Sequence, residues 1–90
     1  MNTAVRTVQI VNSQGLHARP VMKFVDLAAA YASTVRVDKG SEVVDGKSPM
    51  EMMLLEAPQG TLLRIAAEGE DAEQVVEALV ELVNHGFGET

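Results

Sequence analysis

The chain has 90 residues, with 13 acidic against seven basic side chains, a formal net charge of -6 and no cysteine. This charge has the wrong sign for a nucleic-acid surface, and without cysteine there is neither a disulfide framework nor a thiolate metal site. No apolar run approaches the roughly 18 residues of a membrane span, and the N-terminal "MNTAVRTVQIV" lacks the architecture of a signal peptide. We expect one cytoplasmic domain over residues 1–90 without membrane insertion, metal or cofactor, whose partners are proteins or small ligands.

The first third of the chain predicts a strand followed by a helix. Residues 4 to 11 are rich in β-branched side chains and stop at the turn-forming "NSQG", which favours a strand. Beyond them, apolar residues recur at three- and four-residue steps, a period typical of helices: Val21, Phe24, Val25, Ala28 and Ala32. This spacing predicts a helix over about residues 18 to 32, with Pro20 in its first turn.

A hairpin and a short helix are predicted next. Val35 and Val37 alternate with polar residues in "STVRVD", the period of a half-buried strand, and "KG" before "SEVV" predicts a tight turn and a short returning strand. Ser48, Pro49 and Glu51 have the order of an N-cap, a first-turn proline and a glutamate that reaches back to the cap amide. The helix they begin is closed by "APQG".

The last third predicts one strand and one longer helix. Residues 61 to 67 suit a strand with Leu63 and Ile65 on one face, and Asp71 followed by Gln74 predicts a capped helix start. The apolar stripe of that helix consists of Ala72, Val75, Val76, Leu79, Leu82 and Val83. The order β-α-β-β-α-β-α, without linker or repeat, predicts an α+β two-layer sandwich with three helices over one face of a four-stranded sheet. This pattern leaves the strand order open.

Chemistry is concentrated in "GLHARP", residues 15 to 20. If the helix begins at Ala18, His17 is its N-cap, and the free amides of Ala18 and Arg19 form an anion site to which the Arg19 guanidinium adds a planar donor. A free imidazole titrates near pH ~6.5, so a neutral ring there is a nucleophile able to accept a phosphoryl group. Two plainer interpretations stay open: His17 as a surface or capping residue, and Arg19 paired with Asp26 or another carboxylate.

Three segments together carry a resemblance to a known family. "GLHARP" after "VNSQ", "DGKSPMEMMLL" further along and "GEDAEQVVEALVELV" near the end strongly resemble the HPr family, the histidine-containing phosphocarriers of the bacterial phosphoenolpyruvate-dependent phosphotransferase system. The resemblance spans essentially the whole chain and implies an open-faced β-sandwich with an antiparallel sheet. It also implies that enzyme I phosphorylates His17 on Nδ1, that Arg19 binds the phosphoryl group, and that an enzyme IIA domain receives it. A carrier that presents one face to successive partners is expected to be a monomer.

Ser48 has two compatible interpretations. As an N-cap it stabilises its helix by about one kcal/mol. The resemblance implies a regulatory site, because HPr kinase/phosphorylase modifies the serine at this position in many relatives, and a helix N-terminus tolerates a phosphate. Pro49 and Glu51 depart from the isoleucine and glycine common in the family, and Glu51 would place a like charge beside the phosphate.

The methionines are either core residues or a contact surface. Core packing is favoured for Met53, whereas Met22, Pro49 and Met50 are predicted to form an exposed patch that docks several partners. His85 is expected only to complement the C-terminus of the last helix.

Two functional rivals belong to other classes. One is a regulatory docking module with little role in sugar transport. If it is switched only at Ser48 it would not need the intact "GLHARP", whereas a nitrogen-control branch of the family shares that histidine motif. The other is a small hydrolase such as an acylphosphatase, against which the lack of a water-positioning group near Arg19 argues. The sequence does not distinguish the sugar and nitrogen branches of the family.

Overall fold

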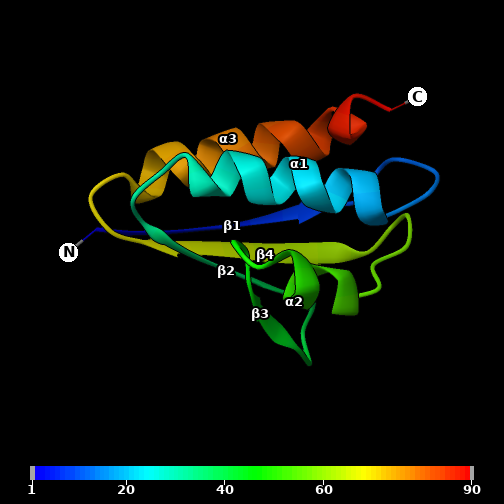
Figure 1. The fold of residues 1–90 in the computed structure, drawn as a ribbon, viewed down its shortest axis with the longest axis horizontal. Helices are drawn as coiled ribbons and strands as arrows, with labels where there is room; N and C mark the ends of the chain where they lie inside the picture. Colours follow the sequence, from blue (N-terminus) through cyan, green and yellow to red (C-terminus); the bar gives the residue numbers. More distant parts are fainter. Residues whose placement is uncertain (1, 90) are drawn as a thin grey trace.

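Strands and helices form two layers in the computed structural model, which describes residues 2–89 (Figure 1). In chain order the elements are β1 (Thr3–Gln9), α1 (Ala18–Ala29), β2 (Thr34–Asp38), β3 (Val43–Asp45), α2 (Pro49–Leu54), β4 (Leu62–Glu68), α3 (Ala72–Asn84) and the 3-10 turn η1 (Gly86–Gly88). The predicted element order and α+β class are confirmed. No helix in residues 2–89 is both long and apolar enough to cross a membrane.

The four strands form one antiparallel sheet in the order β1-β4-β2-β3. β4 pairs with β1 along its whole length, so Thr3 lies opposite Glu68 and Gln9 opposite Leu62. The pairing continues past the strands, where the Ile10 amide donates to the Thr61 carbonyl at 2.9 Å. The segment after β1, which leads into α1, is therefore held beside the segment that precedes β4.

The core lies between the sheet and the helical layer. Val35, Val37, Leu63 and Ile65 point into it and are buried, as their alternation predicted. α1 and α3 run side by side over the sheet (Figure 1), and Phe24 of α1 is fully buried between the layers. Burial of these apolar side chains is the main stabilising contribution to the fold.

The first helix ends three residues earlier than its apolar period predicts. Its last turn tightens, because the amides of Ala30 and Tyr31 donate to carbonyls three residues back, at 3.2 Å each. Ala32 lies outside the helix and is exposed, so its place in the predicted stripe is wrong. The amides of Ala32 and Ser33 donate instead to a side chain at the start of α3.

That side chain is Asp71, which stands at the N-cap of α3 but makes no capping hydrogen bond there. Its carboxylate accepts hydrogen bonds from the Ala32 amide at 2.8 Å, the Ser33 amide at 2.9 Å and the Ser33 hydroxyl. The Ser33 hydroxyl, followed by the Ala32 amide, lowers the pKa of the Asp71 carboxyl below its ordinary value. The predicted capping role is wrong because the carboxylate ties α3 to the loop between α1 and β2.

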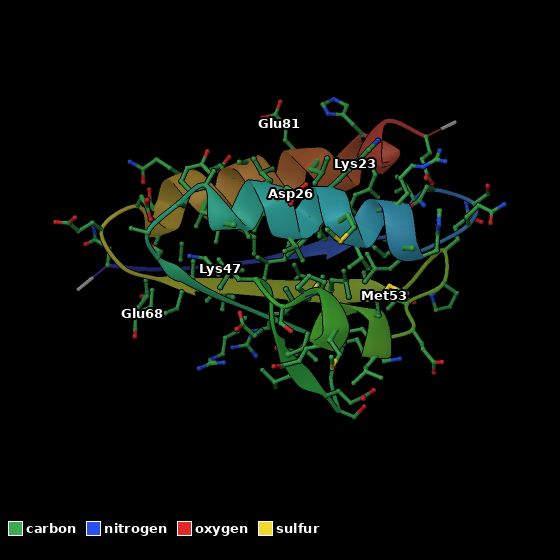
Figure 2. All side chains as sticks on the ribbon, viewed as in Figure 1. Lys23, Asp26, Lys47, Met53, Glu68 and Glu81 are labelled. Atoms are coloured by element: carbon green, nitrogen blue, oxygen red, sulfur yellow. The ribbon has the colours of Figure 1, made fainter. Side chains whose placement is uncertain are left out.

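The short second helix buries a different methionine from the one predicted. Met52 is fully buried, whereas Met53, labelled in Figure 2, is exposed over 44% of its surface, so the core assignment of Met53 is wrong. The six residues of α2 make fewer than two turns, so the helix buries only one side chain, that of Met52. Leu55, directly after the helix, is also buried. The preceding hairpin is also wider than predicted, because residues 39–42 separate the paired Asp38 and Val43.

Candidate functional site

A glycine turn brings the first candidate residue to the start of α1. Gly15 has φ +69, and a Cβ on it would lie 2.6 Å from the Ala57 carbonyl oxygen, so a larger residue does not fit without movement. The next amide, of Leu16, donates to the same Ala57 carbonyl at 2.8 Å. This loop is thus clamped against the chain after α2, and it delivers His17 to a defined position.

His17 is the N-cap of α1, as predicted. Its backbone is extended and its carbonyl accepts from the Val21 amide at 3.0 Å, but its side chain makes no capping bond. The ring is therefore free for other contacts, with 39% of the side chain exposed. The amides of Ala18 and Arg19 belong to the first turn, where an α-helix has no internal acceptors for them.

One ring nitrogen of His17 faces a carboxylate from the far end of the chain. Nε2 lies 3.2 Å from Oε1 and 3.1 Å from Oε2 of Glu89, whose side chain is only 17% exposed. Within residues 2–89, Nδ1 makes no hydrogen bond. The geometry thus distinguishes the two nitrogens, with Nε2 occupied and Nδ1 free.

Asn12 holds that carboxylate in place. Its buried Nδ2 donates to Glu89 Oε1 at 3.0 Å and to the Gly15 carbonyl at 2.8 Å, so it joins the glycine turn to Glu89. Burial by itself would raise the pKa of Glu89, but the hydrogen bonds from His17 and Asn12, together with the charges of His17 and Arg19, leave it lowered. Glu89 is accordingly a carboxylate at neutral pH.

The segment that carries Glu89 is folded by three consecutive left-handed residues. Gly86, Phe87 and Gly88 have φ values of 62°, 58° and 76°. Positive φ is unfavourable for phenylalanine, but its side chain is buried in the core, which offsets the cost. Lys23 of α1, labelled in Figure 2 beside this turn, donates a 2.6 Å hydrogen bond to the Phe87 carbonyl.

Together these residues line a shallow cleft at the start of α1, formed by Ser13, Gln14, His17, Arg19, Lys23, Gly88 and Glu89. Arg19 is exposed there, and the described part of the chain shows no ion pair between it and Asp26. The pairing with Asp26 proposed from sequence is therefore not observed, while the carboxylate that the charge of Arg19 affects is Glu89. Two cationic side chains and an imidazole share a cleft with first-turn amides, an arrangement suited to an anion.

Sequence reasoning missed Asn12, Lys23 and Glu89 as members of this cluster. Their spacing carries no motif, because the contacts to Glu89 and Phe87 cross more than 60 residues. The only local signal is "GFG", which marks a turn but does not say what the turn approaches.

Ser48 is the N-cap of α2, and its hydroxyl accepts a 3.2 Å hydrogen bond from the Glu51 amide. The predicted hydrogen bond from the Ser48 amide to the Glu51 side chain is wrong. Glu51 Oε1 accepts from the Asp45 amide at 3.0 Å, and the Ser48 amide instead donates to the Asp45 carbonyl. The glutamate thus fastens the end of β3 to α2.

Exposed apolar side chains gather on α1 and α2, two helices in contact with each other. Met22 and Pro49 are exposed, as predicted, and Met50 is 77% exposed. Met53 and Leu54 extend this exposed set. We call these five residues the apolar patch; none of them occupies the cleft. His85 is the C-cap residue of α3, near the position predicted for it.

Comparison with known proteins places this arrangement in a family. A family model described as "PTS HPr component phosphorylation site" matches residues 4–85. Phosphocarrier protein HPr of Pseudomonas aeruginosa is 47% identical over 83 residues, covering 91% of this chain and 92% of the relative. The chain belongs to the HPr family. The resemblance inferred from "GLHARP" is confirmed.

Solved structures and a larger relative agree with the HPr assignment. The crystal structure of HPr-C-His from Thermoanaerobacter tengcongensis matches with a TM-score of 0.90 at 40% identity, covering 100% of this chain and 99% of that chain. The multiphosphoryl transfer protein of Haemophilus influenzae is 41% identical over 88 residues, which are 94% of this chain and 18% of the relative. The chain is an HPr phosphocarrier of the phosphotransferase system, and its partners are proteins of that system. These matches favour the carrier over the hydrolase and the purely regulatory module.

Proposed function

We propose that His17 is the phosphoryl acceptor of this HPr and that Nδ1 forms the bond to phosphorus. The observation that carries the proposal is the contrast between the two ring nitrogens: Nε2 is held by Glu89, while Nδ1 has no hydrogen-bond partner in residues 2–89. The exposed ring sits at the N-cap of α1 without capping it, so a partner can reach it. A free nitrogen on an accessible imidazole is a competent nucleophile.

Arg19 and the first-turn amides hold the transferred group. The amides of Ala18 and Arg19 and the positive end of the helix dipole favour an anion beside His17, and the exposed guanidinium can bind two phosphoryl oxygens. In the accepting step Nδ1 donates its lone pair to phosphorus on phospho-enzyme I. The bond from phosphorus to the donor breaks and its electron pair stays with enzyme I. Delivery to an enzyme IIA domain follows the same chemistry with this chain as donor.

The apolar patch supports successive docking of these partners. Methionine side chains are flexible and polarisable, so one surface can repack against enzyme I and then against an enzyme IIA domain. Because the patch lies outside the cleft, docking leaves His17 free to react. We propose that the chain works as a cytoplasmic monomer and a single domain, since a self-association covering this surface would block transfer.

Labelling tests the acceptor directly. Incubated with enzyme I and labelled phosphoenolpyruvate, the chain should take up one phosphate that is labile in acid and stable in base. His17→Ala should abolish uptake, while His85→Ala, which changes the other histidine of the described chain, should leave it intact. Label retained by His17→Ala would refute the assignment.

Regulation at Ser48 stays a prediction of the family resemblance. The half-exposed hydroxyl supports access by HPr kinase/phosphorylase, and the Glu51 amide that donates to it would also favour an anion. The Glu51 carboxylate, three residues along the chain, opposes the added charge. Mass spectrometry after treatment with that kinase and ATP should show an acid-stable adduct that Ser48→Ala removes. No adduct would leave Ser48 with its capping role alone.

A further inference from the structure

We propose that Glu89 is a positioning residue for phosphoryl transfer: its carboxylate holds Nε2–H of His17, so that the Nδ1 lone pair is presented to phosphorus and the positive charge that develops on the ring is stabilised. This inference rests on the proposed role of His17 as acceptor. It concerns a contact between residues 72 positions apart, which no motif of the chain contains.

The contact assigns the ring proton. An ionised carboxylate only accepts hydrogen bonds, and both oxygens of Glu89 lie within 3.2 Å of Nε2, so the proton is on Nε2. In a neutral imidazole the other nitrogen then carries the lone pair. Glu89 therefore fixes both the tautomer and the orientation in which Nδ1 is the nucleophile.

The attraction between the His17 ring and the Glu89 carboxylate grows stronger as phosphoryl transfer proceeds. When Nδ1 bonds to phosphorus, the bond from phosphorus to the donor breaks, its electron pair leaves with the donor, and Nε2 retains its proton. The ring consequently acquires positive charge, which lies directly against the Glu89 carboxylate. Because Glu89 is largely shielded from solvent, this attraction is screened less than between exposed groups. A buried carboxylate stabilises imidazolium in the same way in the serine hydrolase triad.

Glu89 is held in advance of the reaction. Asn12 donates to Oε1 from a buried position, and the preceding Phe87 is anchored by its core side chain and by Lys23. Preorganised groups need no reorientation at the moment of transfer, which is the condition under which electrostatic stabilisation is most effective. A residue of a freely moving chain end would not meet it.

Two substitutions separate hydrogen bonding from charge. Glu89→Gln keeps an oxygen that accepts from Nε2–H but removes the charge, and Glu89→Ala removes both. The matched control is Glu81→Ala, which deletes an exposed carboxylate of α3 that does not line the cleft; Figure 2 labels this residue. For each variant, rapid-quench transfer from phospho-enzyme I gives kcat and KM, and circular dichroism confirms the fold.

We expect Glu89→Ala to lower kcat roughly tenfold with little change in KM, by analogy with other carboxylates that orient a histidine. Glu89→Gln should recover part of the loss, and the Glu81→Ala variant should match the unmodified chain. In nitrogen NMR spectra, the Nε2–H signal of His17 should be protected from exchange in the unmodified chain and lose that protection in Glu89→Ala.

Three results would overturn the inference. They are an unchanged kcat in Glu89→Ala, a loss confined to KM, and spectra that place the proton on Nδ1 in the unmodified chain. In each case His17-dependent labelling would still support His17 as the acceptor residue, so the two proposals fail separately; the third result alone would also count against Nδ1 as the atom that forms the bond. Gly88→Ala gives an independent check: it retains Glu89 but strains a residue at φ +76, and it should also lower kcat.

Discussion

The ammonium group of Lys23 donates a 2.6 Å hydrogen bond to the carbonyl oxygen of Phe87, so the first helix holds the C-terminal turn beside its own start. The turn in question is the left-handed run that ends at Gly88 and leads directly into Glu89. Breaking this bond would loosen the carboxylate without altering His17 or Glu89 themselves. Lys23 also lines the cleft, so its replacement both loosens the Glu89 segment and removes one cation from the anion site.

Lys23→Met should slow transfer in the same direction as Glu89→Ala, but less. Loss of this hydrogen bond should also cost roughly 1 kcal/mol of stability, measured by urea unfolding. Lys39→Met is the matched control, because Lys39 also bonds a backbone carbonyl, that of Glu56 at 3.2 Å, but lies outside the cleft. Equal transfer rates in the two variants would show that anchoring the turn is irrelevant to transfer.

Arg19→Ala should lower the rate of phosphoryl transfer by roughly 100-fold, the scale seen when a donor to a transition-state oxygen is removed. Arg19→Lys should recover only part of the rate, since an ammonium cannot bind two oxygens in the planar geometry of guanidinium. Melting temperatures should stay unchanged, because Arg19 is exposed. Arg64→Ala, an exposed substitution on β4, serves as control, and a normal rate in Arg19→Ala would remove that residue from the site.

Asn12→Asp should impair transfer more than Asn12→Ala. Asp replaces the amide donor by a second carboxylate 3.0 Å from Glu89 Oε1, and the like charges should drive Glu89 away from His17. Asn12→Ala should cost about 1 to 2 kcal/mol, because the Gly15 carbonyl also loses its donor. Chemical denaturation and quench kinetics measure the two effects, and a faster Asp variant would contradict the expected repulsion.

Acid should weaken the link between Asp71 and Ser33. The folded state lowers the pKa of Asp71, chiefly through the Ser33 hydroxyl, so it favours the ionised form. The resulting stability is present above the pKa of the unfolded chain and is lost as the pH falls through the folded value. Asp71→Asn should therefore melt below the unmodified chain at neutral pH, with the difference shrinking in acid. A difference independent of pH would contradict this linkage.

Met50 and Met52 of α2 should respond differently to substitution. Met52→Ala creates a cavity in the core and should cost about 2 to 5 kcal/mol. Met50→Glu, in the apolar patch, should leave the melting temperature unchanged but raise the KM for enzyme I roughly tenfold, since a charge replaces an apolar contact. Melting curves and transfer kinetics check both, and an unaltered KM would move the docking surface elsewhere.

Local motifs allowed the N-caps to be predicted, because a cap is decided by a few adjacent residues. His17 and Ser48 both lie where the sequence places them. The period of the strands likewise identified Leu63 and Ile65 as core residues. In α2, by contrast, six residues are too few for a helical period to show which methionine points inward.

Contacts between distant residues could not be predicted in this way. Asp71 has the sequence context of a cap, yet it binds Ser33, which lies 38 positions earlier. Glu89 belongs to the site only because the strand order and the two long helices bring the chain end back to α1. Such competition between a local and a distant partner is decided by the complete packing.

The separation of His17 from Glu89 also has a consequence during protein synthesis. A ribosome adding about 5 to 20 residues per second needs roughly 4 to 14 seconds to cover the 72 positions between them. Throughout that interval the nascent chain contains His17 but not the carboxylate that positions it. β1 also stays unpaired until β4 is synthesised, because β4 is its only partner in the described sheet. Competence for transfer is thus expected to arise late, so that a ribosome-bound fragment competes poorly with finished carriers for the phosphoryl donor.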